Sequence, residues 1–173
     1  MMSKHATTCA MDWGIDLNRL SHAYIIQGNV ISQIHDAADY LAALILCEGE
    51  GQAPCGACGA CILTNSSNNP DLIYINVPKD KKSIGADEAR ALINDVYIKP
   101  FRSNRKVYII ADADKLTVQA QNTLLKVLEE PPSYAVFIIC VASPDIILDT
   151  IHSRSSHIRL SQEQNSNLSD YIA

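Results

Sequence analysis

The chain has 173 residues, of which 47% are hydrophobic and 19% are charged, and its formal net charge is −5. This composition is typical of a globular domain with a full core, and the negative charge argues against strong non-specific DNA binding, which requires lysine and arginine to neutralise phosphates. No apolar run approaches the ~20 residues of a membrane helix, and residues 1–12 lack the apolar centre of a signal peptide, so the cytoplasm is the expected compartment.

Apolar runs and helical periodicities alternate along the chain. Residues 1–20 are expected to be irregular, with Trp13 covering the edge of the core. Strands are predicted at 23–27, 72–77, 107–111, 135–141 and 157–160, and helices at 30–46, 86–97, 118–130 (capped by Thr117) and 145–151. Uniformly apolar strands that alternate with helices are typical of a parallel sheet covered on both faces. The sequence therefore predicts a three-layer α/β fold.

The first predicted strand is followed by a glycine and then by a helix, which is the order of a phosphate-binding loop. The pattern G-x-x-x-x-G-K-[ST] binds nucleotides through backbone amides, a lysine on the β- and γ-phosphates and a hydroxyl on magnesium. Counted from Gly28, the second glycine, the lysine and the hydroxyl would be residues 33, 34 and 35. The chain has Gln33, Ile34 and His35 there. The frame of a nucleotide site is present without the groups that hold a nucleotide.

Four of the six cysteines lie within fifteen residues, in the spacing Cys47-x7-Cys55-x2-Cys58-x2-Cys61. Without a secretory signal, clustered cysteines are typical of metal sites rather than disulfides. The neighbouring glycines, Gly56 and Gly59, permit the sharp turns that a closed tetrahedral site needs, so we predict structural Zn²⁺ bound by these four cysteines. Cys9 and Cys140 are isolated and are expected to be small hydrophobic residues.

Two other interpretations of the cysteine cluster stay open. A bacterial iron–sulfur run needs a fourth cysteine three residues after Cys61, followed by proline, whereas the chain has Asn65 and Ser66. An iron–sulfur cluster that uses Cys47 is not excluded by this spacing, and neither is a group of reduced thiols without metal.

Two segments are rich in cations and two histidines stand apart. Lys99, Arg102, Arg105 and Lys106 precede the third strand, and Lys79, Lys81 and Lys82 lie in the loop 78–85. These cations could contact DNA phosphates or an acidic partner, but a solvated loop is the simpler interpretation. His22 and His35 have no evident ligand partner and are expected to be structural or exposed.

Several motifs occur together in a fixed order. They are "RLSHAYIIQG", the cysteine segment after the first helix, "NNPDLIYI", "VYIIADADKLTVQAQNTLLKVLEEPPSYAVFII" and "SRSS". On these motifs, which cover about residues 20–160, the chain resembles the delta-prime and gamma/tau clamp-loader subunits of bacterial DNA polymerase III. The resemblance implies an AAA+ module with a P-loop NTPase fold and a sheet ordered 5-1-4-3-2.

The same resemblance implies a domain organisation. Residues 1–160 would form the AAA+ domain, with a zinc module at 47–69 inserted after the first helix. Residues 161–173 would begin a truncated lid domain, and the helical collar domain that holds the ring together would be absent. We expect a fragment, rather than a naturally short paralogue, and we expect the isolated fragment to be monomeric.

Three positions depart from the ATP-hydrolysing members of the family that the chain resembles. The lysine and hydroxyl positions are Ile34 and His35, the Asp-Glu pair after the third strand is Ala111-Asp112, and the polar sensor after the fourth strand falls at Val141-Ala142. Without these groups neither phosphate charge nor magnesium is held, so we expect no ATP binding or hydrolysis.

Arg154 stands in Ser-Arg-Ser where the family has Ser-Arg-Cys. The resemblance implies an arginine finger that reaches the ATP of a neighbouring subunit, where a planar guanidinium meets the γ-phosphate. The simpler interpretation of this residue alone is a surface ion pair.

The leading functional interpretation is a non-hydrolysing scaffold subunit that supports ATP-dependent loading of the sliding clamp on DNA. Its partners would be the gamma/tau and delta subunits, with transient contacts to the clamp and to primer-template DNA in the nucleoid-associated replisome. One alternative is an active ATPase of the gamma/tau type. Another is a separate zinc module for nucleic acid, which the absence of Lys and Arg from residues 47–70 argues against.

Overall fold

The apolar segments predicted as strands pair into one parallel sheet. The computed structural model describes residues 13, 15–17, 19–51 and 53–160. Its strands are β1 (Ala23–Gln27), β2 (Leu72–Ile75), β3 (Lys106–Ile110), β4 (Ala135–Val141) and β5 (Ser156–Arg159). They lie in the order β2-β3-β4-β1-β5, and every pair is parallel. This is the predicted order read from the opposite edge, so the α/β class and the strand order are confirmed.

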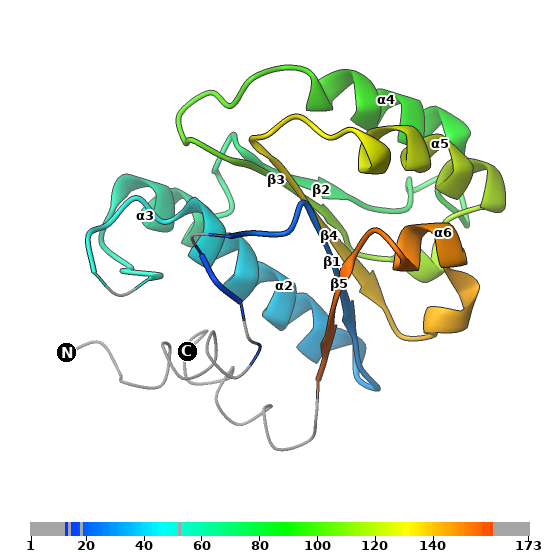
Figure 1. Ribbon diagram of the computed structural model, residues 1–173, viewed down its shortest axis with the longest axis horizontal. Helices are drawn as coiled ribbons and strands as arrows, with labels where there is room; N and C mark the ends of the chain where they lie inside the picture. Colours follow the sequence, from blue (N-terminus) through cyan, green and yellow to red (C-terminus); the bar gives the residue numbers. More distant parts are fainter. Residues whose placement is uncertain (1–12, 14, 18, 52, 161–173) are drawn as a thin grey trace.

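Helices cover both faces of the sheet, which gives three layers (Figure 1). The helices are α2 (Ile31–Leu46), α3 (Gly59–Asn65), α4 (Ala86–Val96), α5 (Val118–Glu129) and α6 (Asp149–His152), with short 3-10 turns η1 (Ala113–Lys115) and η2 (Pro144–Ile146). Helices α2 and α3 lie on one face, and α4, α5 and α6 lie on the other. Among the described residues, none of these helices is both long and apolar enough to cross a membrane.

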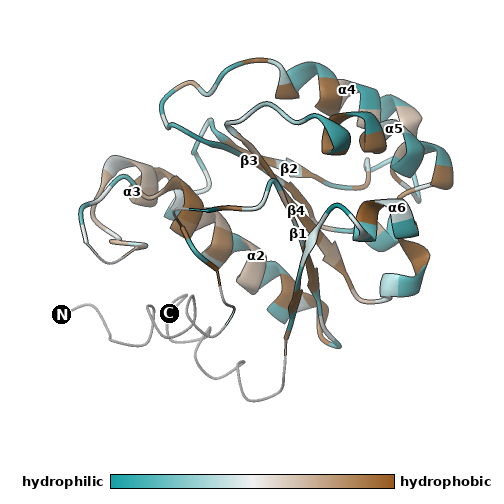
Figure 2. Cartoon of the chain, in the orientation of Figure 1, coloured by the Kyte–Doolittle hydropathy of each residue, from teal (hydrophilic) through white to brown (hydrophobic). Residues whose placement is uncertain are grey.

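Alternating side chains of the buried strands divide the core into two clusters. On β1, Tyr24 and Ile26 pack with α2, whereas Ala23 and Ile25 pack with α4, α5 and α6. The strands therefore need apolar residues at successive positions, because side chains on both faces are buried. Figure 2 shows the result as hydrophobic strands at the centre and mixed hydropathy on the helices. Trp13 packs at the edge of the α2 cluster with its ring against Tyr40, as predicted.

Some boundaries differ from the predicted ones. Residues 59–65 of the cysteine segment form α3, a helix that was not among the predicted ones. The strand predicted at 72–77 ends at Ile75. The single helix predicted at 145–151 is two short helices, because the buried side chain of Gln121 accepts a hydrogen bond from the Leu148 amide and donates one to the Ile146 carbonyl. The Ile146 carbonyl and the Leu148 amide thus bond to a distant side chain instead of forming the hydrogen bonds of a continuous helix.

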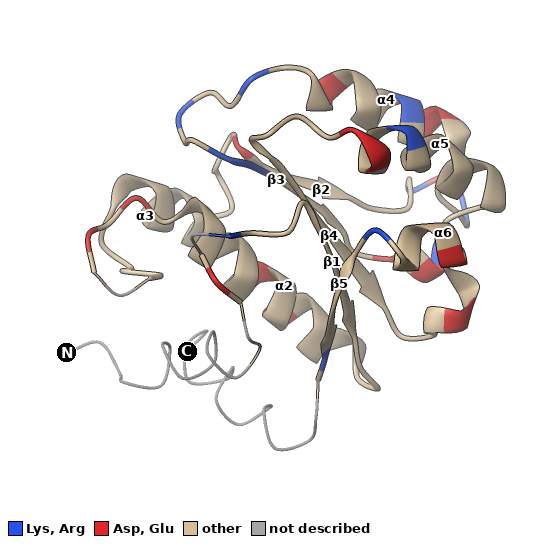
Figure 3. Cartoon of the chain, in the orientation of Figure 1, with Lys and Arg blue, Asp and Glu red and all other residues tan. Residues whose placement is uncertain are grey.

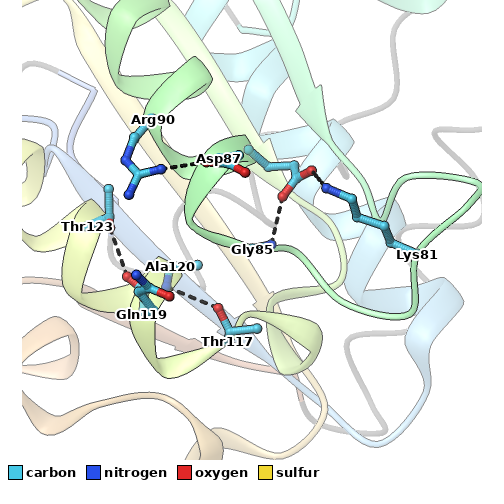
Figure 4. Close-up of polar contacts among 9 residues, drawn as sticks. Lys81, Gly85, Asp87, Arg90, Thr117, Gln119, Ala120 and Thr123 are labelled. Atoms are coloured by element: carbon cyan, nitrogen blue, oxygen red, sulfur yellow. Dashed lines mark hydrogen bonds and ion pairs between the residues drawn. The ribbon is translucent and has the colours of Figure 1, made fainter.

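The amino ends of α4 and α5 are capped by side chains, as Figure 4 shows. The Glu88 carboxylate accepts a hydrogen bond from the Gly85 amide and pairs with Lys81. Thr117 accepts a hydrogen bond from the Ala120 amide, so the predicted cap of this helix is confirmed. Side-chain oxygens at these positions satisfy amides that have no partner inside the helix.

The prediction of a solvated basic loop before β3 is wrong for Lys106. This lysine begins β3 with 4% of its surface exposed, its ammonium lies 2.8 Å from the Asp95 carboxylate, and it donates to the carbonyl oxygens of Asp95 and Ile98. It thus closes the carboxyl end of α4. Lys99 and Arg102 are exposed. Figure 3 shows cations along this loop.

Asp71 anchors the same loop from the opposite side. Its fully buried carboxylate accepts hydrogen bonds from the amides of Phe101, Arg102 and Ser103 at 2.5, 2.8 and 2.7 Å. No signal in the sequence pairs Asp71 with residues thirty positions away.

We expect Asp71→Ala to lower the free energy of unfolding by about 3 kcal/mol, because three buried amides lose a charged acceptor. Urea unfolding followed by circular dichroism measures this change. The exposed Asp80→Ala is the matched control and is expected to change stability by no more than about 0.5 kcal/mol. Equal effects of the two substitutions would contradict the anchoring role.

Candidate functional site

The loop after β1 does not have the course of a phosphate-binding loop. Strand β1 ends at Gln27 and α2 begins at Ile31, so only Gly28, Asn29 and Val30 connect them. A phosphate-binding loop keeps the residues between its two glycines outside the helix, so that their amides surround the phosphates. Here residues 31–33 already belong to the first turn of α2. The connection between β1 and α2 is therefore too short to form such a loop.

Side chains leave little room beside the amino end of α2. Ile34 is 2% exposed and packs close to Gly28. The cavity that remains is about 10 Å³, and it is lined by Ile31, Ile34, His35, Ala111, Asp112, Asp114, Cys140, Val141 and Ala142. A single water molecule already needs roughly 10–15 Å³. Little space therefore remains beside Ile34, the position where the sequence lacks the expected lysine.

His35 and Ala111, which the sequence analysis assigned to the magnesium-hydroxyl and carboxylate positions, contact each other. The His35 Nε2 atom lies 2.9 Å from the carbonyl oxygen of Ala111. Since a carbonyl only accepts, this nitrogen carries the proton. A direct hydrogen bond thus joins α2 to the residue that follows β3.

The carboxylates near this position are engaged elsewhere. Asp112 pairs with Lys115 at 3.2 Å. Asp114 accepts hydrogen bonds from the amides of Ala142 and Ser143, both at 2.9 Å. Asp114 therefore fixes the turn after β4, a function that the sequence analysis missed because the two segments are 28 residues apart.

The four clustered cysteines lie together, as their spacing predicts. Their Sγ atoms are all within 4.8 Å of one another, and those of Cys55 and Cys61 are 4.0 Å apart. Tetrahedral zinc with Zn–S bonds of ~2.3 Å separates its sulfurs by ~3.8 Å. The donor set and its dimensions therefore fit a metal ion such as zinc.

Backbone amides support the sulfurs. The amides of Cys55, Cys58 and Cys61 donate to the Sγ atoms of Cys47, Cys55 and Cys58, respectively, at 3.2 to 3.4 Å. Burial alone would raise the pKa of the Cys58 thiol, but amide donors and neighbouring thiols lower that pKa to about 6. Such donors stabilise the thiolate, which is the form that binds metal.

The glycines of this segment serve two different purposes. Gly56 has a φ of 68°, which is a left-handed turn, as the sequence analysis expected. Gly59 instead begins α3, and a Cβ atom there would collide with the guanidinium of Arg102. Gly59 thus allows close contact between α3 and the basic loop before β3.

The isolated residues have simpler surroundings. Cys140 is 1% exposed in β4, and burial raises the pKa of its thiol to about 12, in agreement with its expected hydrophobic role. Cys9 lies outside the described residues, as does the segment 161–173 that was assigned to a lid. His22 is half-buried, and its Nε2 atom has no hydrogen-bond partner among the described residues.

Arg154 lies at the opposite end of the sheet from residues 28–35. It precedes β5 and so lies where the parallel strands begin, whereas residues 28–35 follow β1 and lie where the strands end. Its Nη2 atom donates to the Glu129 carboxylate at 2.9 Å, and its Nη1 atom donates to the Thr150 carbonyl at 2.9 Å. The surface ion pair of the simpler interpretation is present, and the role toward a neighbour stays a prediction.

A family model described as "DNA polymerase III, delta subunit" matches residues 5–164. The chain belongs to this family. The predicted delta-prime clamp-loader assignment is confirmed, since the chain is 38% identical over 140 residues to DNA polymerase III subunit delta' of Bacillus subtilis, a match that covers 81% of this chain and 42% of that relative. It is 33% identical over 133 residues to subunit delta' of Haemophilus influenzae, with coverage of 77% and 40%.

The gamma/tau subunits are related too. The chain is 29% identical over 160 residues to DNA polymerase III subunit gamma/tau of Mycobacterium tuberculosis H37Rv, which covers 91% of this chain and 27% of that relative. A gamma subunit-related protein of Thermotoga maritima has the same fold, with a TM-score of 0.62 at 22% identity, over 92% of this chain and 46% of that one. The chain spans less than half the length of these relatives.

Proposed function

We propose that this chain is the ATPase-like domain of a non-hydrolysing delta-prime subunit, which supports ATP-dependent loading of the sliding clamp on DNA by its neighbours. The observation that carries the proposal is the small space, about 10 Å³, beside Ile34, His35 and Ala111 in a chain of this family. The three-layer frame stays useful without ATP, because it presents surfaces to adjoining subunits.

An active ATPase of the gamma/tau type is the second candidate, favoured only by the relatives of that name. The helical course of residues 31–33 and the missing lysine argue against it. A nucleic-acid-binding zinc module is a weaker candidate, because the segment before α3 carries acidic and no basic side chains (Figure 3). Phosphate binding needs the opposite charge.

Calorimetric titration with magnesium-ATP is expected to show no binding at millimolar nucleotide, because neither phosphates nor magnesium find a ligand. The matched variant Ile34→Ala enlarges the cavity without adding a lysine, and it is also expected not to bind. Micromolar binding by the unmodified chain would contradict the proposal. Binding by Ile34→Ala alone would show that only the volume of Ile34 excludes the nucleotide.

Arg154 is proposed to act on the ATP of a neighbouring subunit. It lies where the parallel strands begin, at the opposite end of the sheet from this chain's predicted nucleotide position, which supports a phosphate outside the chain as its ligand. The gamma/tau and delta subunits are the proposed partners. Zn²⁺ is the proposed ion of the four-cysteine site, where it would hold residues 47–69 in place and take no part in a reaction.

Contacts with the clamp and with primer-template DNA are proposed for the assembled loader. The loop that follows α4 exposes three large apolar side chains, Tyr97, Ile98 and Phe101, and the last has 87% of its surface exposed. Exposed apolar groups of this size are typical of protein-binding surfaces. They lie beside Lys99 and Arg102 on the anchored loop.

A further inference from the structure

Arg154 is held by contacts within its own chain. Its guanidinium donates through Nη2 to Glu129 at the end of α5, and through Nη1 to the Thr150 carbonyl and, at 3.3 Å, to the Ser153 hydroxyl. The pair is partly open to solvent, with 34% of the arginine side chain and 52% of the glutamate side chain exposed. Both nitrogens of the fork are therefore already engaged.

The backbone that carries Arg154 is well fixed. The Arg154 and Ser155 amides donate to the carbonyls of Ile151 and His152, and the Ser155 hydroxyl donates to Ile151 at 2.8 Å. On either side of the turn, the rings of His152 and His157 stack with centroids 5.2 Å apart. A change in the direction of the guanidinium therefore requires rotation of the side chain rather than movement of the turn.

A phosphate and Glu129 would compete for this guanidinium. Paired recognition of a phosphate uses the same two nitrogens, Nη1 and Nη2, that now contact Thr150 and Glu129. A γ-phosphate at the guanidinium would also lie within a few ångströms of the Glu129 carboxylate, where like charges repel. A phosphate that binds Nη1 and Nη2 as a pair must therefore displace Thr150 and Glu129 from these nitrogens.

We propose that Glu129 is an intramolecular latch. It holds Arg154 in an ion pair until the arginine binds the ATP of the neighbouring subunit instead. This inference rests on the proposed role of Arg154 as a finger in trans. The latch adds a step to each engagement, because only the fraction of molecules with a released arginine can bind the phosphate. Since exposed ion pairs are weak, the latch lowers the binding of Arg154 to the phosphate by about two- to fivefold and does not block it.

The test uses the complete clamp loader, reconstituted with the full-length subunit that contains this domain. Glu129→Gln removes the charge of the latch and keeps the size of the side chain. Glu130→Gln is the matched control, since Glu130 is the next residue, is exposed and has no ion pair among the described contacts. Arg154→Ala and the double variant Arg154→Ala/Glu129→Gln complete the cycle.

ATP turnover at the adjoining site is expected to rise about two- to fivefold with Glu129→Gln and to be unchanged with Glu130→Gln. The gain is expected to vanish in the Arg154→Ala background, because no finger remains to be released. If Arg154→Ala lowers turnover but Glu129→Gln leaves it unchanged or lowers it, the latch is wrong and the finger stands. If Arg154→Ala itself changes nothing, the proposed function of Arg154 fails first.

Discussion

Arg154→Ala is expected to lower ATP turnover at the adjoining site of a reconstituted loader by about 10³-fold or more, the range over which arginine fingers act. The guanidinium lies at the opposite end of the sheet from the predicted nucleotide position, where Ile34 and His35 leave about 10 Å³. A phosphate on which Arg154 acts must therefore belong to another subunit. Turnover is best measured in a loader in which only the adjoining site is active.

Two further variants make this measurement specific. Arg159→Ala removes the same charge from the other end of β5, and it is expected to leave turnover unchanged. Arg154→Lys is expected to restore little, because an ammonium cannot reproduce two planar donors. Subunit assembly and metal content are expected to stay the same in all three variants. Unaltered turnover in Arg154→Ala would return Arg154 to the role of an ion-pair partner of Glu129.

Cys61→Ser is expected to reduce the metal content from about one zinc per chain to near zero. Cys61 is the most buried of the four cysteines, and a closed four-thiolate site does not tolerate loss of a ligand. Residues 47–69 are expected to lose protection against hydrogen exchange and proteolysis, because metal binding and local folding are coupled there. The sheet is expected to remain folded, since its two core clusters are built mainly from other segments.

Elemental analysis and hydrogen exchange measure both effects. Cys140→Ala is the matched control, because it removes a buried thiol outside the cluster and is expected to keep the metal. Iron in the unmodified protein would support the iron–sulfur alternative, and absence of metal in protein purified without chelator would support reduced thiols. Either result would overturn the zinc proposal.

The sequence by itself determined the class of fold and the composition of the metal site. Runs such as residues 135–141 are apolar at every position, as in strands buried on both faces, and their alternation with helices predicted the parallel sheet. The cysteine spacing likewise predicted a candidate metal site, because short gaps bring thiols together whatever the rest of the chain does. Local sequence patterns of this kind predict a structure without knowledge of the tertiary contacts.

The tertiary structure decided which polar groups meet across long stretches of the chain. Asp71 holds amides thirty residues away, Lys106 is buried against Asp95, and Arg154 pairs with Glu129. Each contact joins the ends of different strands and helices, and no periodicity encodes which ends become neighbours. The predicted nucleotide position is of the same kind: the sequence predicted that its ligands are missing, but only the packing of Ile34 and His35 against the end of β3 shows how little space remains there.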